Sequence, residues 1–158
     1  MPDNNTKTTD PRMHTAEHIL SGTMVMLHGC GRPFTTHLEK RKSKADYSFS
    51  RNLVSEEIAA IEQRVNDVVA RDLPVHEQIL DRAAAAELFD LTRLPDAAGE
   101  LVRVVHVGDY DACPCSGLHV KSTREIGRFR IVSTSHEAGA LRIRFRLIAQ
   151  DAPDNTSD

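Results

Sequence analysis

The sequence predicts one α+β domain, in which helices pack on an antiparallel sheet. Two segments carry apolar residues at helical spacing, and several short segments are rich in β-branched residues or alternate apolar with polar ones. No internal repeat or flexible linker divides the 158 residues, a length that suits a single domain with a sizeable core. We expect this domain to span residues 11–150, between polar, disordered tails at residues 1–10 and 151–158.

The first helix is expected to run from Pro11 to about His28. Asp10 is a favourable N-cap residue, proline is favoured at the first helical position, and Gly29 is typical of a helix end. Three residues at helical spacing are expected to pack inward from one face of this helix. They are Leu20, Met24 and Leu27.

The other elements follow from the same kinds of pattern. Helices are expected at residues 55–72 and 82–89, where apolar residues or alanines follow a favourable first turn. Strands are expected at residues 34–39, 45–50, 75–80, 101–107, 128–133 and 141–148. Alternation in the last strand places three arginines on one face: Arg142, Arg144 and Arg146.

Composition limits the class of protein. The formal net charge of -3 and the pI near 6.2 argue against a strongly basic nucleic-acid binder. The three cysteines are an odd number, which favours reduced thiols over a disulfide framework. The N-terminus is polar, and no apolar run approaches the ~20 residues of a membrane span. We therefore expect a cytoplasmic protein with no membrane contact.

Two pairs of metal-ligating residues dominate the sequence. His14 and His18 are four residues apart, so they lie on one face of the first helix. Cys115 and His119 have the same spacing in a loop near the other end of the chain. Three imidazoles and one thiolate are a ligand set that zinc prefers. We expect the fold to bring the two pairs together around one zinc ion.

Three features of this site stay open at this point. Four protein ligands would close a structural site, whereas three ligands and a water would leave the metal reactive. Cys113 is close enough in sequence to compete with Cys115 as a ligand. Glu17, between the two histidines, is either a catalytic proton carrier or a solvent-facing helix residue.

A longer set of motifs covers most of the chain from Met13 to Ile148. Its residues are His14-Thr15-Ala16-Glu17-His18-Ile19-Leu20, Ile61-Glu62, Val65-Asn66, Leu73-Pro74-Val75, Cys115-Ser116-Gly117-Leu118-His119-Val120, Thr123, Glu125-Ile126-Gly127 and Phe129. This set resembles the editing domain of alanyl- and threonyl-tRNA synthetases, and in particular the short stand-alone trans-editing proteins called AlaX. The resemblance implies the α+β fold of the synthetase second additional domain. It also implies zinc in the cleft, with His14, His18, Cys115 and His119 at the positions of the family's metal motif.

The sequence departs from this family at two positions. Leu118 replaces the threonine of the family's Cys-Gly-Gly-Thr-His motif. Cys113 stands where synthetase editing domains often have an acidic residue. Both departures bear on the choice of substrate rather than on the class of reaction.

The function that the resemblance implies is zinc-dependent hydrolysis of mischarged aminoacyl-tRNA in trans, as a quality control of translation. Seryl-tRNA(Ala) is the expected substrate. The alternatives are mischarged tRNA(Thr), a small ester or peptide for a metal hydrolase, and a zinc-stabilised RNA- or partner-binding module without catalysis. The identity of the tRNA and the oligomeric state stay open.

Further residues are assigned to the substrate. Three polar residues of the first expected strand are candidates to contact the amino acid, because a serine hydroxyl needs a polar partner. They are Thr35, Thr36 and His37. Basic residues are expected to contact phosphate: Arg142, Arg144, Arg146 and the cluster at residues 40–44. An ester at the end of a tRNA needs few such contacts, so the negative net charge is compatible with this substrate.

Overall fold

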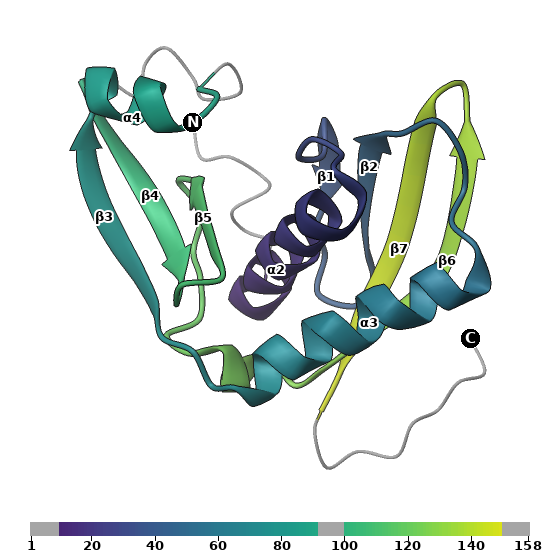
Figure 1. The fold of residues 1–158 in the computed structure, drawn as a ribbon. Coiled ribbons are helices and arrows are strands. Elements are labelled where there is room, and N and C mark those ends of the chain that lie inside the picture. The colour runs from purple at the N-terminus through teal and green to yellow at the C-terminus, as the bar shows by residue number, and fades with distance from the viewer. Residues whose placement is uncertain (1–9, 92–99, 150–158) are drawn as a thin grey trace.

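The computed structural model describes residues 10–91 and 100–149, and Figure 1 shows their arrangement. The helices are α2 (Pro11–His28), α3 (Ser55–Ala70) and α4 (Arg82–Leu88), with a short 3-10 helix, η2 (Thr123–Ile126). The strands are β1 (Thr35–His37), β2 (Ser43–Ser48), β3 (Val75–Asp81), β4 (Leu101–Val107), β5 (Asp111–Pro114), β6 (Arg128–Glu137) and β7 (Ala140–Ile148). The mixture of helices and strands confirms the α+β prediction.

The strands form two antiparallel sheets rather than the one sheet expected. The larger sheet has the order β1-β2-β7-β6, and the smaller has the order β3-β4-β5. Helix α2 lies between the two sheets, and α3 runs below α2 in the view of Figure 1. One helix is therefore in a position to contact residues from both sheets.

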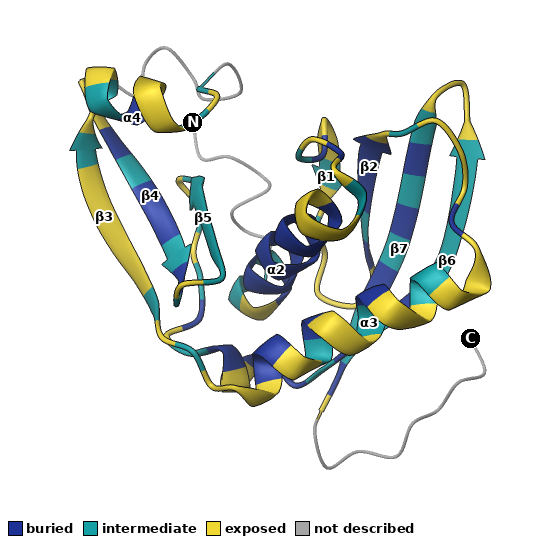
Figure 2. Ribbon diagram, in the orientation of Figure 1, coloured by how far each residue is buried: buried dark blue, intermediate teal, exposed yellow. Residues whose placement is uncertain are grey.

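Helix α2 begins and ends as the sequence predicts. The Asp10 carboxylate accepts a hydrogen bond from the Arg12 backbone N–H, and Gly29 ends the helix in the left-handed region at φ 64°. Residues 13 and 15–24 are buried, so this part of the helix is buried on every side (Figure 2) and not on one face as expected. Leu27, expected to pack inward, is 39% exposed because it lies beyond this buried part.

Helix α3 packs one face against β6. The residues buried on this face are Ile61, Val65, Val68 and Val69. The Asn66 side chain donates to the Phe129 carbonyl and accepts from the Phe129 N–H, both at 2.8 Å. The Ile131 N–H donates to Glu62 at 2.7 Å. These polar contacts fix the position of the helix along the strand.

The predicted strands differ from the observed ones mainly at their ends. No strand was expected between residues 107 and 128, but β5 pairs there with β4. A bulge between Ile131 and Ser133 shifts the register of β6, after which pairing with β7 continues to Glu137. The first two strands are shifted as well: β1 is shorter than expected, and β2 begins earlier, at Ser43.

The two expected tails fall largely outside the described residues. Residues 1–9, 92–99 and 150–158 are not described. Asp10, expected to belong to the first tail, forms the N-cap of α2. None of the helices in the described ranges combines the length and the apolar composition that a membrane crossing requires.

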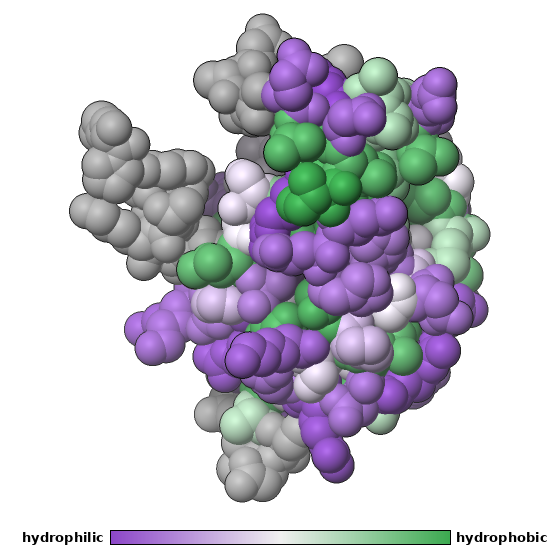
Figure 3. Space-filling view, turned by 90° about the vertical axis from the view of Figure 1, so that its left-hand side faces the viewer, coloured by the Kyte–Doolittle hydropathy of each residue, from purple (hydrophilic) through white to green (hydrophobic). Residues whose placement is uncertain are grey.

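Two clusters of buried apolar side chains hold the elements together. The larger joins α2 and α3 to the inner face of the four-stranded sheet and reaches Val107 of β4. The smaller packs Ala85 of α4 on Val102 and Val104 of β4. The view from the β3 side (Figure 3) shows apolar surface toward the α4 end of the smaller sheet. The exposed large hydrophobic residues on these elements are Ile79, Leu88 and Leu101.

Candidate metal centre

Helix α2 and the loop after β5 place the two pairs of predicted ligands side by side. His14 and His18 project from α2, and Cys115 and His119 belong to the loop. One ligand atom from each residue lies within 4.8 Å of the other three. The His14 and His119 rings are stacked, with centroids 4.2 Å apart. The structure thus brings these four residues together, and the group can hold a metal ion.

Arg103 of β4 holds the loop in place. The Cys115 N–H donates to the Arg103 carbonyl at 3.0 Å. The Arg103 guanidinium donates to the carbonyls of Cys115 at 2.9 Å and Gly117 at 2.7 Å. At Gly117 the loop passes so close to α2 that a Cβ would lie 2.2 Å from Cε1 of His14. A side chain at this position would therefore displace the His14 ring or the loop.

The two distances from the Cys115 sulfur to the ring nitrogens of His14 and His119 fit a tetrahedral metal ion. Cys115 Sγ lies 3.3 Å from His14 Nε2 and 3.5 Å from His119 Nε2. Zinc bonds of about 2.05 Å to nitrogen and about 2.3 Å to sulfur place two tetrahedral ligands roughly 3.5 Å apart. The donor set of three imidazoles and one thiol is therefore compatible with zinc.

Burial keeps the imidazoles neutral. It lowers the pKa of His14 to about 4 and that of His119 to about 3. Burial also lowers the pKa of His18 well below its ordinary value. A neutral imidazole has a lone pair to offer a metal ion. Burial raises the pKa of the Cys115 thiol, so a metal ion must displace its proton on binding.

Two ring nitrogens of the cluster are buried without a hydrogen bond in the described part of the chain. They are His14 Nδ1 and His18 Nδ1. The Leu118 backbone lies close enough to His14 to offset part of the lowering of the His14 pKa. His14 Nδ1 nevertheless makes no hydrogen bond to it. His18 Nδ1 is 3.9 Å from Asp111 Oδ2. Leaving buried polar atoms unpaired is costly, and His14 turns its other ring nitrogen, Nε2, toward Cys115 Sγ.

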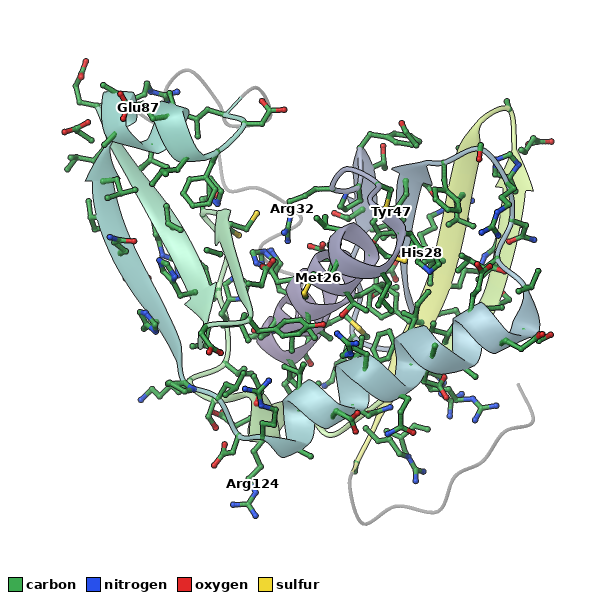
Figure 4. The ribbon with its side chains drawn as sticks, viewed as in Figure 1. Met26, His28, Arg32, Tyr47, Glu87 and Arg124 are labelled. Carbon is green, nitrogen blue, oxygen red and sulfur yellow. The ribbon has the colours of Figure 1, made fainter. Side chains whose placement is uncertain are left out.

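Asp111 of β5 connects the metal centre to Arg32. Its carboxylate accepts hydrogen bonds from the Arg32 guanidinium at 2.9 and 3.4 Å, and Arg32 lies between α2 and β5 in Figure 4. Asp111 can approach α2 because Gly22 has no side chain: a Cβ there would lie 2.7 Å from Asp111 Oδ1. Sequence reasoning missed this ion pair. A glycine inside a helix signals a close contact, but it does not identify the partner.

Glu17 is buried, which excludes the solvent-facing alternative for this residue. Its exposed fraction is 6%, and the Ser21 hydroxyl donates to its carboxylate at 2.6 Å. Ser21 also shares a hydrogen bond of 2.8 Å with the Tyr47 hydroxyl of β2. Burial raises the pKa of Cys115, and the negative charge of Glu17 adds to this rise. Glu17 therefore lies within electrostatic range of the metal centre.

Cys113 does not belong to the group of described residues that can hold a metal ion. It lies in β5, where its thiol is 3.5 Å from the Pro114 carbonyl oxygen. Burial raises the pKa of this thiol to about 12. Cys113 is therefore a protonated neighbour of the four residues that converge.

The three residues expected to contact the amino acid lie on two different faces of strand β1. Thr35 and His37 lie, by their pairing with β2, on the face of the sheet turned away from α2. His37 is exposed, and its Nε2 lies 2.6 Å from a carboxylate oxygen of Glu39. Thr36 pairs with Ala45, which belongs to the larger core. Of the three, Thr36 is the one on the face that carries α2.

The arginines of β7 also lie on the outer face of the larger sheet, because the residues that alternate with them are buried. Arg142 donates to both carboxylate oxygens of Asp46, at 2.7 and 3.0 Å. Arg144 donates to the hydroxyls of two β6 serines at 3.3 and 3.4 Å, and both arginines line a cavity of about 220 Å³. Arg146 follows on the same face, and residues 40–42 are exposed in the turn before β2. The metal centre is on the other side of this sheet.

The fold and the site together define an α+β protein in which a buried helix and a loop share a candidate metal centre. Residues 102–144 match the family described as the threonyl and alanyl tRNA synthetase second additional domain. This match confirms the resemblance drawn from the sequence.

Two curated relatives support this assignment. The chain is 34% identical over 132 residues to an alanine–tRNA ligase of Fervidobacterium nodosum, a match that covers 83% of this chain and 15% of the ligase. It is 35% identical over 138 residues to an alanine–tRNA ligase of Bacillus subtilis, covering 82% of this chain and 15% of the ligase. The chain thus spans about 15% of the length of the relatives that it matches.

Proposed function

We propose that the protein is a zinc-dependent deacylase that hydrolyses mischarged aminoacyl-tRNA in trans, with seryl-tRNA(Ala) as its first substrate. The convergence of three imidazoles and a thiol within 4.8 Å, in a domain related to those of threonyl and alanyl tRNA synthetases, carries this proposal. The resemblance to the AlaX proteins supports action on a tRNA charged by another protein.

The four converging residues are the proposed zinc ligands: His14, His18, Cys115 and His119. A zinc ion held by these residues would supply a Lewis acid for the ester carbonyl and for the negative charge that develops on its oxygen. The buried helix α2 holds two of the ligands, and the Arg103 hydrogen bonds hold the loop with the other two. Rigid elements of this kind keep a site close to its working geometry.

Glu17 is the proposed proton carrier. Its carboxylate is buried, accepts a hydrogen bond from Ser21, and acts electrostatically on the Cys115 thiol. A positioned base can take a proton from the attacking water and return it to the departing ribose oxygen. We predict that Glu17→Gln lowers the deacylation rate by about 10²- to 10⁴-fold, while zinc content measured by elemental analysis stays at the wild-type level. Glu56→Gln, at an exposed position of α3, is the control, and equal rates in the two variants would remove Glu17 from the mechanism.

Thr36 is the proposed partner of the amino-acid side chain. A threonine hydroxyl on the α2 face of β1 can pair with the hydroxyl of a serine ester, whereas alanine would leave it unpaired. An apolar pocket alone separates two amino acids that differ by a hydroxyl by only ~100-fold. Leu118, next to His119, is 67% exposed and offers no hydroxyl of its own. This departure makes mischarged tRNA(Thr) the alternative substrate.

A deacylation assay on a panel of charged tRNAs tests the proposal. We expect zinc-loaded protein to hydrolyse seryl-tRNA(Ala) and to leave alanyl-tRNA(Ala) intact, and we expect chelation of the metal to stop the reaction. Seryl-tRNA(Thr) in the same panel tests the alternative substrate. If folded, zinc-loaded protein at micromolar concentration leaves every mischarged tRNA intact, the deacylase proposal fails.

The convergence of four protein ligands also favours a second function, a zinc-stabilised module that binds RNA or a protein partner. Four ligands fill a tetrahedral shell, as in structural zinc sites. Chelation separates the two functions. Loss of the circular dichroism signal with the metal indicates a structural site, whereas loss of hydrolysis with an unchanged signal indicates a catalytic one.

A further inference from the structure

His119 differs from the other two histidines of the cluster in the state of its outer ring nitrogen. In the described ranges, Nδ1 of His14 and Nδ1 of His18 are buried without a hydrogen bond. Nδ1 of His119 lies 2.9 Å from the hydroxyl oxygen of Thr15. The Thr15 hydroxyl therefore contacts the His119 ring at the nitrogen that faces away from Cys115.

Thr15 is a buried residue of α2 that joins three parts of the molecule. Its hydroxyl lies 3.1 Å from the Pro11 carbonyl, one turn earlier in the helix. The Val120 N–H donates to the same hydroxyl oxygen at 3.2 Å, just after the metal loop. The side chain is fully buried, so water does not compete for these contacts.

The number of protons on the Thr15 hydroxyl and the His119 ring allows two arrangements of these hydrogen bonds. A hydroxyl has one proton to donate and two lone pairs to accept with, and the Val120 N–H uses one lone pair. If the hydroxyl donates to Pro11, its second lone pair accepts from a proton on Nδ1 of His119. If the hydroxyl donates to Nδ1 instead, the ring proton must be on Nε2, because the ring is neutral.

These arrangements differ in what His119 presents to the metal position. Nε2 of His119 lies 3.5 Å from Cys115 Sγ, so this nitrogen faces the other ligands. With the proton on Nδ1, Nε2 offers a lone pair to a metal ion. With the proton on Nε2, the same position is blocked. The Pro11 carbonyl supplies an acceptor for the hydroxyl proton and makes the first arrangement available.

We propose that Thr15 is a positioning residue for the metal centre: its hydroxyl donates to the Pro11 carbonyl, accepts the Nδ1–H of His119, and so fixes the tautomer that presents Nε2 to the metal. This inference rests on the proposed metal centre and extends it to a residue behind the ligands. Groups that hold the outer nitrogen of a ligating histidine set its tautomer and orientation, and their removal costs about 10- to 100-fold in metal affinity.

Nitrogen-15 NMR of the metal-free wild-type protein gives the first test. Long-range correlations between ring protons and ring nitrogens distinguish a protonated nitrogen from one with a free lone pair. We expect His119 to carry its proton on Nδ1 at neutral pH. A proton on Nε2 overturns the proposal. This measurement needs no variant and no tRNA, so its outcome is separate from that of the deacylation assay.

Zinc affinity of matched variants gives the second test, by competition with a colorimetric chelator. We expect Thr15→Val, which keeps the shape and removes the hydroxyl, to bind zinc about 10- to 100-fold more weakly, and Thr15→Ser to bind it like the wild type. Thr23→Val is the control, because Thr23 is an equally buried α2 threonine whose hydroxyl bonds to Ile19 and Tyr110. Wild-type affinity in Thr15→Val, or an equal loss in Thr23→Val, overturns the proposal. If Thr15→Val does not fold, the zinc affinity of Thr15→Ser and the His119 tautomer of the wild type decide whether the proposal stands.

Discussion

Gly117 is the residue at which the metal loop comes closest to α2. A Cβ there would lie 2.2 Å from Cε1 and 2.5 Å from Nδ1 of His14. We predict that Gly117→Ala displaces this ring and lowers zinc affinity by about 10-fold or more, the size of effect expected when a ligand loses its support. Competition with a colorimetric chelator measures the affinity.

Gly31→Ala is the matched control for this prediction. A Cβ at Gly31 would meet nothing within 4 Å, so this variant should bind zinc as tightly as the wild type. If Gly117→Ala also binds zinc as tightly, the fit of the loop against His14 does not determine the metal site.

At the scale of residues, the sequence predicts neighbours on one element better than contacts between elements. A spacing of four aligns His14 and His18 on α2 without any tertiary information. The burial of Glu17 depends on the sheets that pack around α2. The approach of Asp111 depends on the register of β5. No short-range pattern encodes either contact, so both were missed.

The first turn of α3 shows how one acidic side chain stabilises a helix start. Glu57 accepts hydrogen bonds from the Arg51 guanidinium at 2.8 Å and from the Val54 N–H at 2.9 Å. The Arg51 bond is the main reason that the pKa of Glu57 falls to about 2. We predict that Glu57→Gln lowers the midpoint of thermal unfolding at pH 7, and that Glu56→Gln, on the exposed side of the same turn, changes it less.

The pH dependence of this difference follows from the direction of the shift. The folded-state pKa of Glu57 is depressed, so its contribution is complete above the unfolded-state pKa of 4.5 and is lost as the pH falls toward about 2. The difference in unfolding midpoint between wild type and Glu57→Gln should therefore shrink across this range. A difference that stays constant from pH 5 to pH 2 would mean that the ionised carboxylate is not responsible.

At the scale of elements, the clarity of the sequence pattern decided which predictions were accurate. Strand β7 alternates buried residues with arginines and was predicted almost to its ends. Helix α2 has a clear N-cap and a clear terminal glycine, and its bounds were correct. Strand β5 has four residues with no regular alternation of apolar and polar side chains, so no strand was expected there. Its pairing with β4 comes from the tertiary structure.

The outer face of the larger sheet is the surface that we propose for RNA phosphates. Arg142 is paired with the Asp46 carboxylate, whereas Arg144 donates to serine hydroxyls, which carry no charge. We predict that Arg144→Ala weakens tRNA binding and reduces the slope of log K against log salt by about 0.7 to 0.9, the value for one phosphate contact. Arg142→Ala should change the slope less, because its charge is already compensated.

Titration of fluorescent tRNA at several salt concentrations measures both slopes. An Arg144→Ala protein with the wild-type slope would show that this face does not contact phosphate. Because the metal centre lies on the other side of the sheet, the variant should also keep its wild-type zinc affinity.

The position of α2 between the two sheets has a consequence for hydrogen exchange. Its buried part touches both sheets, so its backbone cannot open to solvent while either sheet stays packed against it. Amides of residues 16–24 should then exchange only when the whole domain unfolds, at a rate set by its total stability. A metal ion bound through this helix would slow that exchange by stabilising the entire folded state. Loss of the ion would remove this added stability, so both sheets would become more sensitive to proteases together, through more frequent unfolding of the whole domain.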